Sequence, residues 1–204
     1  MTFDVSVEST VTTFVDMPQN HWAVFRIYAL ADIGIIRGFS RSDGRYDFRP
    51  DNTITRAEFM TIITRAFNIH NEYMMYYGLL SDVTPNEWYY SFVVSAINAG
   101  IANPEGMGDG TFGANLPLSR EQMVTFTARA LNVLWDVQFL DASAEAEMLG
   151  KFTDQDTIND FARAGVALCV YLGVLHGFED GTFRPRQNMT RAEVASVKHG
   201  IFVR

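Results

Sequence analysis

The sequence predicts a mainly α-helical protein in which three helix–loop–helix repeats pack as a pseudo-threefold body around a central helical bundle. The same landmarks recur three times, in the same order, along the 204 residues. Apolar residues between the landmarks follow helical spacing, and 48% apolar with 20% charged residues is a globular composition. A pair of short helices cannot bury its own apolar face, so we expect the repeats to pack on one another. An open solenoid is the alternative.

The first helix of each repeat follows an aspartate and ends at a glycine, with an aromatic residue twelve positions before that glycine. The aspartate, aromatic residue and glycine are Asp16, Trp22 and Gly34, then Asp82, Trp88 and Gly100, then Asp154, Phe161 and Gly173. In the first repeat the apolar positions are Trp22, Val24, Phe25, Ile27, Leu30 and Ile33. This spacing predicts a three-turn helix that glycine terminates.

A loop with an Asp-Gly pair follows each first helix. The glycines of these pairs are Gly44, Gly110 and Gly181. Asp-Gly favours tight turns because both residues tolerate positive φ. A phenylalanine then stands seven residues before a hydroxyl residue in every repeat. We expect that hydroxyl to start the second helix.

The second helix of each repeat begins with a capping box, a hydroxyl residue followed three positions later by Glu or Gln. The pairs are Thr55 with Glu58, Ser119 with Gln122, and Thr190 with Glu193. The predicted buried face in the first repeat is Phe59, Met60, Ile63 and Phe67.

The landmarks divide the chain into repeats and connectors. The second connector contains an Ala/Glu stretch that we expect to form an extra helical turn. The predicted divisions are an N-terminal extension at 1–13, repeats at 14–70, 80–135 and 152–204, and connectors at 71–79 and 136–151.

An arginine occupies the first position of each second helix, at Arg56, Arg120 and Arg191. A cation there faces the positive end of the helix dipole, which costs about 0.3–1 kcal/mol. Its recurrence predicts an anion that each guanidinium holds together with free backbone amides. The anion is either the opening aspartate of a repeat or an external carboxylate or phosphate, and the residues alone leave both open.

Composition argues against several classes of function. The formal net charge of −8 disfavours nucleic-acid binding, and no apolar stretch is long enough to insert in a membrane. The single cysteine, Cys169, lies in an apolar run and is predicted to be a buried, inert thiol. No sequence motif couples a histidine to a serine or cysteine nucleophile or gives zinc-ligand spacing, and the acidic stretch at 152–160 lacks the glycine and glutamate of an EF-hand. We expect no catalysis, no cofactor and no metal.

The combined motifs resemble the S-layer homology domain. The third repeat carries them most fully, as Gly177-Phe178-Glu179-Asp180-Gly181-Thr182-Phe183-Arg184-Pro185 followed by Thr190-Arg191-Ala192-Glu193. The resemblance covers essentially the whole chain, in a triple array. It implies a three-pronged spindle that anchors an exported protein non-covalently to the bacterial cell wall. The implied ligand is an anionic secondary cell-wall polysaccharide, in which an amino sugar carries a pyruvate ketal.

The resemblance also implies roles for particular residues in grooves between the repeats. Arg56, Arg120 and Arg191 would hold the ketal carboxylate. Trp22 and Trp88 would offer apolar faces to the sugar, although a core anchor at the base of the first helix is an equal alternative for both. Gly44, Gly110 and Gly181 would let backbone approach the sugar closely.

Departures from the family pattern predict that one groove is degenerate. Asn103 and Pro104 replace Gly-Phe in the second repeat, and Glu121 follows Arg120, where it could neutralise the guanidinium. We therefore rank the grooves of Arg56 and Arg191 above that of Arg120.

Location and partners follow from the same resemblance. Repeats that run to Arg204 with no export signal at the start lead us to expect a piece of a larger exported protein at the bacterial cell surface, fused to a cargo domain. The main alternative function is a protein-binding scaffold without a glycan site.

Overall fold

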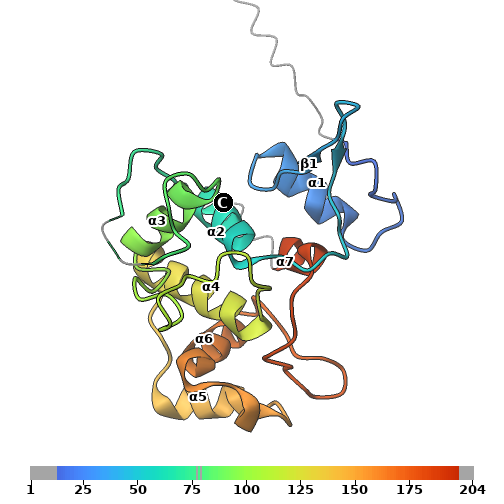
Figure 1. Ribbon diagram of the computed structural model, residues 1–204. Helices are drawn as coiled ribbons and strands as arrows, with labels where there is room; N and C mark the ends of the chain where they lie inside the picture. Colours follow the sequence, from blue (N-terminus) through green and yellow to red (C-terminus); the bar gives the residue numbers. More distant parts are fainter. Residues whose placement is uncertain (1–12, 77, 79, 198–204) are drawn as a thin grey trace, which may run out of the picture.

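The protein is mainly α-helical, as predicted. The computed structural model describes residues 13–76, 78 and 80–197, which contain seven α-helices and one two-stranded sheet (Figure 1). The predicted N-terminal extension, apart from Thr13, and the end of the third repeat lie outside the described residues. The helices are α1 (Val24–Asp32), α2 (Arg56–Ala66), α3 (Tyr90–Asn98), α4 (Arg120–Trp135), α5 (Ala142–Leu149), α6 (Asp160–Tyr171) and α7 (Arg191–Ser196).

The predicted first helices are α1, α3 and α6. A glycine with positive φ follows each of them, Gly34 at 76°, Gly100 at 78° and Gly173 at 63°, so the glycine stop is confirmed. The predicted apolar face of α1 is only half correct. Val24, Ile27 and Leu30 are buried, whereas Trp22, Phe25 and Ile33 are exposed.

The predicted second helices are α2, α4 and α7, and all three begin with a complete capping box. Thr55, Ser119 and Thr190 each accept a hydrogen bond from the amide three residues later, and Glu58, Gln122 and Glu193 each accept one from the amide of the hydroxyl residue. The face of α2 is as predicted, with Phe59, Met60 and Ile63 fully buried and Phe67 partly buried.

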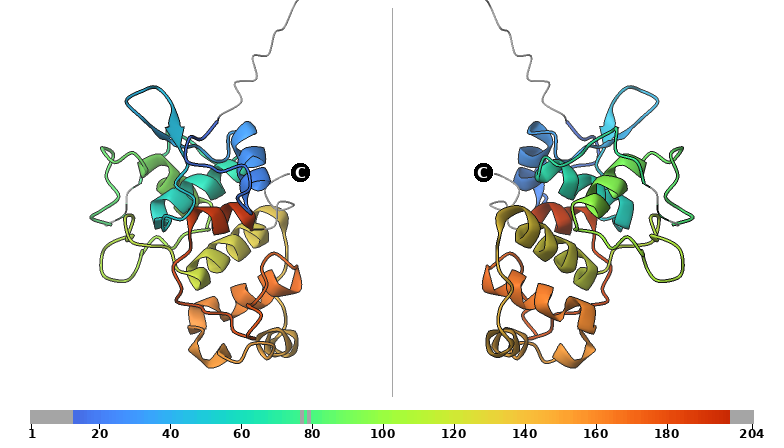
Figure 2. Two further views of the ribbon diagram at one scale, coloured as in Figure 1. Left: turned by 90° about the vertical axis from the view of Figure 1, so that its right-hand side faces the viewer. Right: turned by 90° about the vertical axis from the view of Figure 1, so that its left-hand side faces the viewer.

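The Asp-Gly turns also form. Gly44, Gly110 and Gly181 have φ of 79°, 82° and 79°. In the first repeat the turn joins strands β1 (Phe39–Ser40) and β2 (Tyr46–Asp47), which pair antiparallel. This hairpin and α5 lie at opposite ends of the molecule (Figure 2).

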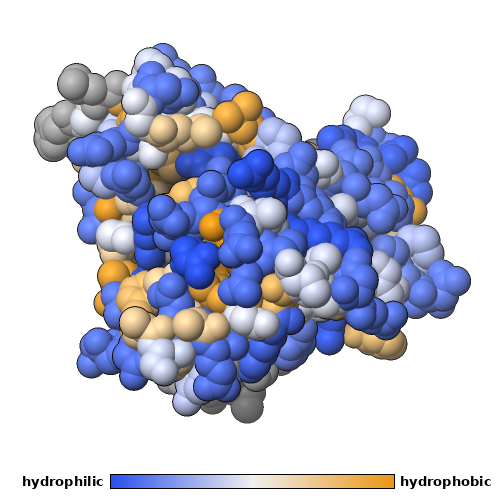
Figure 3. Space-filling model, turned by 90° about the horizontal axis from the view of Figure 1, so that it is seen from below, coloured by the Kyte–Doolittle hydropathy of each residue, from blue (hydrophilic) through white to orange (hydrophobic). Residues whose placement is uncertain are grey.

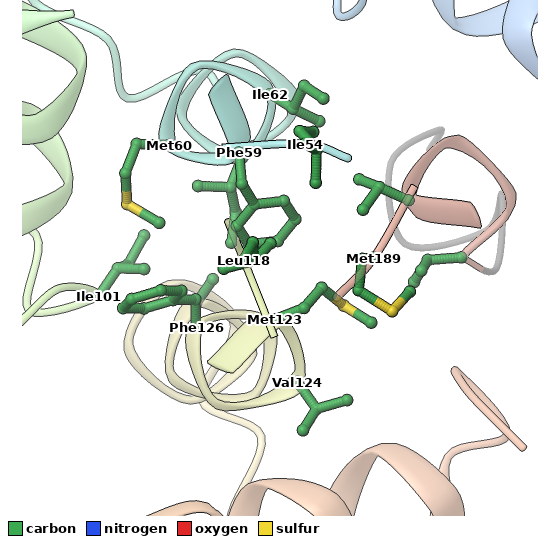
Figure 4. Packing of buried hydrophobic residues seen from close by; sticks show 14 of the residues in the cluster. Ile54, Phe59, Met60, Ile62, Ile101, Leu118, Met123, Val124, Phe126 and Met189 are labelled. Carbon is green, nitrogen blue, oxygen red and sulfur yellow. The ribbon is translucent and has the colours of Figure 1, made fainter. Parts of the chain in front are cut away.

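Each second helix packs on the first helix of the following unit. Helix α2 contacts α3, α4 contacts α6, and α7 contacts α1. The segments that lead into the second helices are joined by backbone hydrogen bonds in a ring. The amide of Ile54 donates to Met189, that of Met189 to Leu118, and that of Leu118 to Ile54, at 2.9–3.0 Å. The side chains of these three residues enter the common core (Figure 4).

The second connector contains more helix than expected, because α5 spans eight residues rather than a single turn. The Asp141 carboxylate accepts a hydrogen bond from the amide of Ala144 and so caps α5. Cys169 is buried against α4, as predicted, and burial raises the pKa of its thiol to about 12. None of the helices in the described part of the chain has the length and apolar character needed to cross a bilayer.

Candidate functional site

The three arginines at the helix starts are buried. Arg56, Arg120 and Arg191 are only 5%, 6% and 6% exposed. Each guanidinium lies over two phenylalanine rings, with its carbon 4.6–5.3 Å from the ring centroids. This contact favours the cation electrostatically and removes it from water.

Each arginine reaches into the loop of the following unit. The Nε of Arg56 donates to the carbonyl of Phe112 at 3.0 Å, and the Nε of Arg191 donates to that of Phe48 at 2.8 Å. Arg120 donates through Nη2 to the carbonyl of His176, and its buried Nε has no hydrogen-bond partner among the described residues. The three side chains thus tie the units together in a cycle.

The backbone amides beside the arginines are not free, and in this respect the prediction is wrong. The amides of Arg56 and Ala57 donate to the carbonyls of Leu116 and Ala114. Equivalent bonds form at the starts of α4 and α7. The helix starts are therefore satisfied inside the protein, and only side chains remain to bind an external group.

The aspartates that open the repeats do not pair with the arginines, so the internal-carboxylate alternative is wrong. Asp16, Asp82 and Asp154 instead each accept two backbone amides of their own loop, at 2.6–2.9 Å. One of the two amides belongs to the phenylalanine that precedes the second helix. The aspartates therefore fix the loop on which the neighbouring arginine rests.

The described ion pairs leave two of the three arginines without a carboxylate partner. Nη1 of Arg191 lies 3.4 Å from Oε1 of Glu58, whereas Arg56 and Arg120 make no ion pair with the described residues. Burial lowers the pKa of both Arg56 and Arg120 to about 10, and it lowers the pKa of Arg191 as well. All three guanidinium groups remain charged at neutral pH.

A separate cavity opens beside each arginine. We name the cavities by that arginine, and their volumes are about 570 Å³ for the Arg191 pocket, 250 Å³ for the Arg56 pocket and 480 Å³ for the Arg120 pocket. The Arg191 pocket is lined by Arg37, Phe39, Thr55, Glu58, Arg65, Trp88 and Arg191 among others. The Arg56 pocket is lined by Arg56, Asn103, Gly106, Met107, Gln122, Thr125, Phe126, Arg129 and Phe161. The Arg120 pocket is lined by Trp22, Arg26, Arg120, His176, Met189 and Glu193 among others.

All three units contribute to each pocket. One unit provides the arginine, and the next provides the third residue of its second helix. The remaining unit provides the aromatic residue that stands twelve positions before the glycine at the end of its first helix. These sets are Arg191, Glu58 and Trp88; Arg56, Gln122 and Phe161; and Arg120, Glu193 and Trp22. The pockets exist only when the units are assembled.

The tryptophans are not core anchors. Trp22 is 61% exposed and Trp88 is 59% exposed, so the structure contradicts the core alternative for both. Exposed tryptophan rings beside buried guanidinium groups provide an apolar and a cationic surface in one pocket. Gly44, Gly110 and Gly181, by contrast, do not line any of the three arginine pockets.

The premise for ranking the Arg120 pocket last is wrong. Glu121 accepts hydrogen bonds from the backbone amide and side-chain amide of Asn159, at 3.2 and 2.7 Å, and is not paired with Arg120. Because each pocket combines residues of different units, the residues that depart from the family pattern line a different pocket. Asn103, Gln122 and Phe161 all line the Arg56 pocket.

Sequence reasoning missed a second arginine in the pockets. Arg65 and Arg129 line the Arg191 and Arg56 pockets, and Arg26 lines the Arg120 pocket. Arg65 and Arg129 each stand nine residues after the first arginine of their helix, and this repeated spacing was the available signal. Burial lowers the pKa of Arg65 to about 10 and also lowers that of Arg129.

The described residues contain no group of three or more His, Cys, Asp or Glu side chains placed to hold a metal ion. In the acidic stretch considered for calcium, both carboxylate oxygens of Asp154 accept loop amides. Residues Gln155–Thr157 form a short 3₁₀ helix.

The three repeats that supply the pocket arginines match a known protein family. The model of the S-layer homology domain matches residues 13–60, 80–124 and 151–195. The chain belongs to the S-layer homology family. The three matches correspond to the three tandem repeats, and each of them includes one of the pocket arginines.

Relatives of the chain are much longer proteins. The chain is 35% identical over 189 residues to an amylopullulanase of Thermoanaerobacterium thermosulfurigenes, covering 93% of this chain and 9% of that protein. It is 34% identical over 191 residues to exoglucanase XynX of Acetivibrio thermocellus, covering 93% of this chain and 16% of that protein. It is 26% identical over 189 residues to the S-layer protein sap of Bacillus anthracis, covering 90% of this chain and 20% of that protein.

Proposed function

We propose that this chain is a cell-wall anchoring module that binds the acidic groups of a secondary cell-wall polysaccharide in its three arginine pockets. The acidic group is the carboxylate of a pyruvate ketal on an amino sugar. The module is not catalytic. S-layer and cell-surface proteins among the relatives support a place at the bacterial cell surface.

One observation carries this proposal. Each pocket contains a buried, desolvated guanidinium group, and in two of the three no carboxylate of the described residues lies within ion-pair distance of it. A buried cation without a partner is costly for the folded protein. That cost is understandable if the site binds an external anion, because a planar guanidinium matches a carboxylate with two parallel hydrogen bonds.

The aromatic residues at the pockets support a sugar as the carrier of the anion. Trp22 and Trp88 expose much of their rings at the Arg120 and Arg191 pockets. A flat aromatic face packs against the apolar C–H face of a sugar or the methyl group of a ketal. The combination of a guanidinium and an exposed ring therefore fits a ketal better than it fits a free inorganic anion.

We also propose that the three units form the pseudo-threefold, three-pronged spindle that the family resemblance implies. The ring of backbone hydrogen bonds through Ile54, Leu118 and Met189 supports this arrangement. The cyclic packing of α2 on α3, α4 on α6 and α7 on α1 supports it as well. In such an arrangement several pockets could engage one polymer chain, which would raise the avidity above that of a single pocket.

The full-length protein is proposed to carry a cargo domain that this module holds at the wall. The chain spans only 9–20% of the length of the relatives described above. Two of these relatives are named as an amylopullulanase and an exoglucanase. The names of these relatives favour a catalytic cargo domain.

Binding to purified wall polymer tests the proposal. We expect the chain to bind intact polymer and to lose binding when mild acid removes the ketals. The triple variant Arg56→Ala, Arg120→Ala, Arg191→Ala should also lose binding. Arg45→Ala is the matched control, because Arg45 is an exposed arginine paired with Asp43 outside the three arginine pockets. Unchanged binding after ketal removal would refute the carboxylate as the ligand.

The scaffold alternative predicts a different outcome, retention of the chain on walls stripped of the polymer. The surface shown in Figure 3 is mostly hydrophilic, with hydrophobic residues in small separate areas. A large continuous apolar patch on a surface often marks a protein-interaction site. This face therefore gives the scaffold reading no support.

A further inference from the structure

The Arg56 pocket differs from the other two in the chemistry of one residue. The third residue of the second helix is Glu58 in the Arg191 pocket and Glu193 in the Arg120 pocket, but Gln122 in the Arg56 pocket. All three side chains perform the same capping task through one oxygen. They differ in the atom that is left over.

The remaining atom is an acceptor in two pockets and a donor in the third. Oε2 of Glu58 accepts the amide of Thr55, and Oε1 lies 3.4 Å from Arg191. Oε1 of Gln122 accepts the amide of Ser119, which directs its NH₂ group to the remaining position. Among the described residues that NH₂ group has no hydrogen-bond acceptor. Asn103 is similar, because its oxygen accepts the amide of Glu105 and its NH₂ group remains available.

The guanidinium of Arg56 is also less occupied than that of Arg191. Its one hydrogen bond to the described residues goes from Nε to Phe112, so both terminal nitrogens are available. In Arg191, by contrast, Nε donates to Phe48, Nη2 donates to Arg37, and Nη1 faces Glu58. An incoming anion at Arg191 would have to compete with a carboxylate that is already present.

The charges of the lining residues also favour anion binding at the Arg56 pocket over the other two. The residues that line the Arg56 pocket include two arginines, Arg56 and Arg129, and no carboxylate. The Arg191 pocket has three arginines, Arg37, Arg65 and Arg191, but also Glu58 in contact with the central guanidinium. The Arg120 pocket sets Arg120 and Arg26 against Glu193.

We propose that the Arg56 pocket is a phosphoryl-binding site and that Gln122 is the residue that gives it this preference. A phosphate monoester is a dianion near neutral pH and has three acceptor oxygens. The two free nitrogens of Arg56 and the NH₂ groups of Gln122 and Asn103 form a donor-only set for those oxygens, and Arg129 adds a second positive charge. In the other two pockets a carboxylate oxygen would repel a phosphoryl dianion more strongly than the single charge of a ketal carboxylate. The phosphoryl assignment rests on the proposed function in one respect, that the pockets are ligand sites, and it replaces the ketal carboxylate as the ligand at the Arg56 pocket only.

The test follows the arginine Nε–Hε signals of the full chain by ¹H–¹⁵N NMR while inorganic phosphate or acetate is added at pH 7.5 and constant ionic strength. Arg→Lys variants assign the signals. We expect phosphate to shift the Arg56 signal at concentrations about tenfold lower than acetate, because a dianion gains more from two guanidinium groups. The Arg120 and Arg191 signals should show no such preference. No response of Arg56 to phosphate, or an equal response of all three arginines, would overturn the proposal.

Two reciprocal variants locate the cause. Gln122→Glu keeps the capping box, as Glu58 and Glu193 do, and should raise the phosphate midpoint at Arg56 about tenfold. Glu58→Gln should give the Arg191 signal a preference for phosphate that it lacks in the wild type. Thermal unfolding checks that both variants fold. An unchanged phosphate midpoint in a folded Gln122→Glu variant would remove Gln122 from the mechanism.

Wall polymer distinguishes the sources of the phosphoryl group. If the Arg56 signal responds to intact polymer but not to polymer freed of phosphate by hydrofluoric acid, the group belongs to the glycan. If it responds to inorganic phosphate alone, the ligand is the free ion. Ketal removal tests the proposed function separately, through the Arg120 and Arg191 signals. If ketal removal left the Arg120 and Arg191 signals unchanged, the proposed ketal ligand would be refuted, but the phosphate result at Arg56 would still hold. A negative phosphate result at Arg56 would likewise leave the ketal proposal intact.

Discussion

Replacement of Arg56 by methionine should not lower stability, although Arg56 is one of the most buried charged residues of the protein. Burial lowers the pKa of Arg56 from 12.5 to about 10, which corresponds to about 3 kcal/mol of unfavourable free energy for the charged form. Methionine keeps an unbranched stem between the rings of Phe112 and Phe126 and removes the charge. It also removes the hydrogen bond to the carbonyl of Phe112, a loss of about 1–3 kcal/mol. The two effects largely offset each other and leave a net change of about 0–2 kcal/mol in favour of the variant.

Arg191→Met is the matched comparison, and it should behave differently. The substitution would leave Glu58 without its cation at 3.4 Å and two carbonyls without their donors. A charge left without its partner in this way costs about 3 kcal/mol. We therefore expect Arg191→Met to be at least about 2 kcal/mol less stable than Arg56→Met, which corresponds to about 4–8 °C in Tm for a chain of this size.

Urea denaturation followed by helical circular dichroism measures both variants, with the m-value as a check that the transition keeps its cooperativity. Polymer binding measured on the same samples completes the comparison. Arg56→Met should lose ligand binding at its pocket while remaining folded. If Arg56→Met is instead as destabilised as Arg191→Met, Arg56 has a structural role and the case for a ligand at its pocket fails.

Three further predictions concern stability and reactivity. Gly165→Val should lower the free energy of unfolding by about 1–3 kcal/mol, measured by thermal unfolding, because a Cβ at Gly165 would lie 3.1 Å from the Cα of Thr125 on α4; an unchanged Tm would contradict this close packing of α6 on α4. Hydrogen bonds from Thr182 and a neighbouring arginine lower the pKa of Asp180 to about 2. The ionised Asp180 therefore contributes to the stability of the folded protein above about pH 4, and this contribution is lost as the pH falls towards 2. Asp180→Asn should make the stability measured by urea denaturation decline less over that interval, and an identical decline would refute the assignment. Cys169 should not react with a thiol reagent until the protein is denatured, since its thiol is buried and its pKa is raised to about 12; rapid reaction in the native protein would show that α6 opens.

The helices were predictable because their signals are local. A capping box, an apolar period and a terminal glycine lie within one helix, and the sequence shows them together. Thr55 with Glu58 and Gly34 after α1 behave as their spacing predicts. The buried face of α2 followed from the same periodicity.

The composition of the pockets was not predictable from the sequence in the same way. Arg56, Gln122 and Phe161 come from three different units and meet only through tertiary packing. Reasoning within one repeat assigned Asn103 and Glu121 to the groove of Arg120, whereas Asn103 lines the Arg56 pocket and Glu121 binds Asn159. A sequence repeat does not reveal which copy supplies which wall of a shared cavity.

The sequence alone also did not decide the roles of the aspartates and tryptophans. Asp16 could have met either a cation or a set of amides, since both satisfy a carboxylate, and only the loop geometry decides for the amides. Trp22 and Trp88 have the hydrophobicity of core residues. They stand just before their helices rather than on the inward face, and this places them at the pockets.

The closed circuit of amide–carbonyl bonds through Ile54, Leu118 and Met189 limits how such a protein can change its length. Deleting one unit would leave an open donor and an open acceptor in this circuit, and a fourth unit would have to widen a ring whose members already touch. This module should therefore be duplicated three repeats at a time. A truncated copy should fold only if another chain supplies the missing unit.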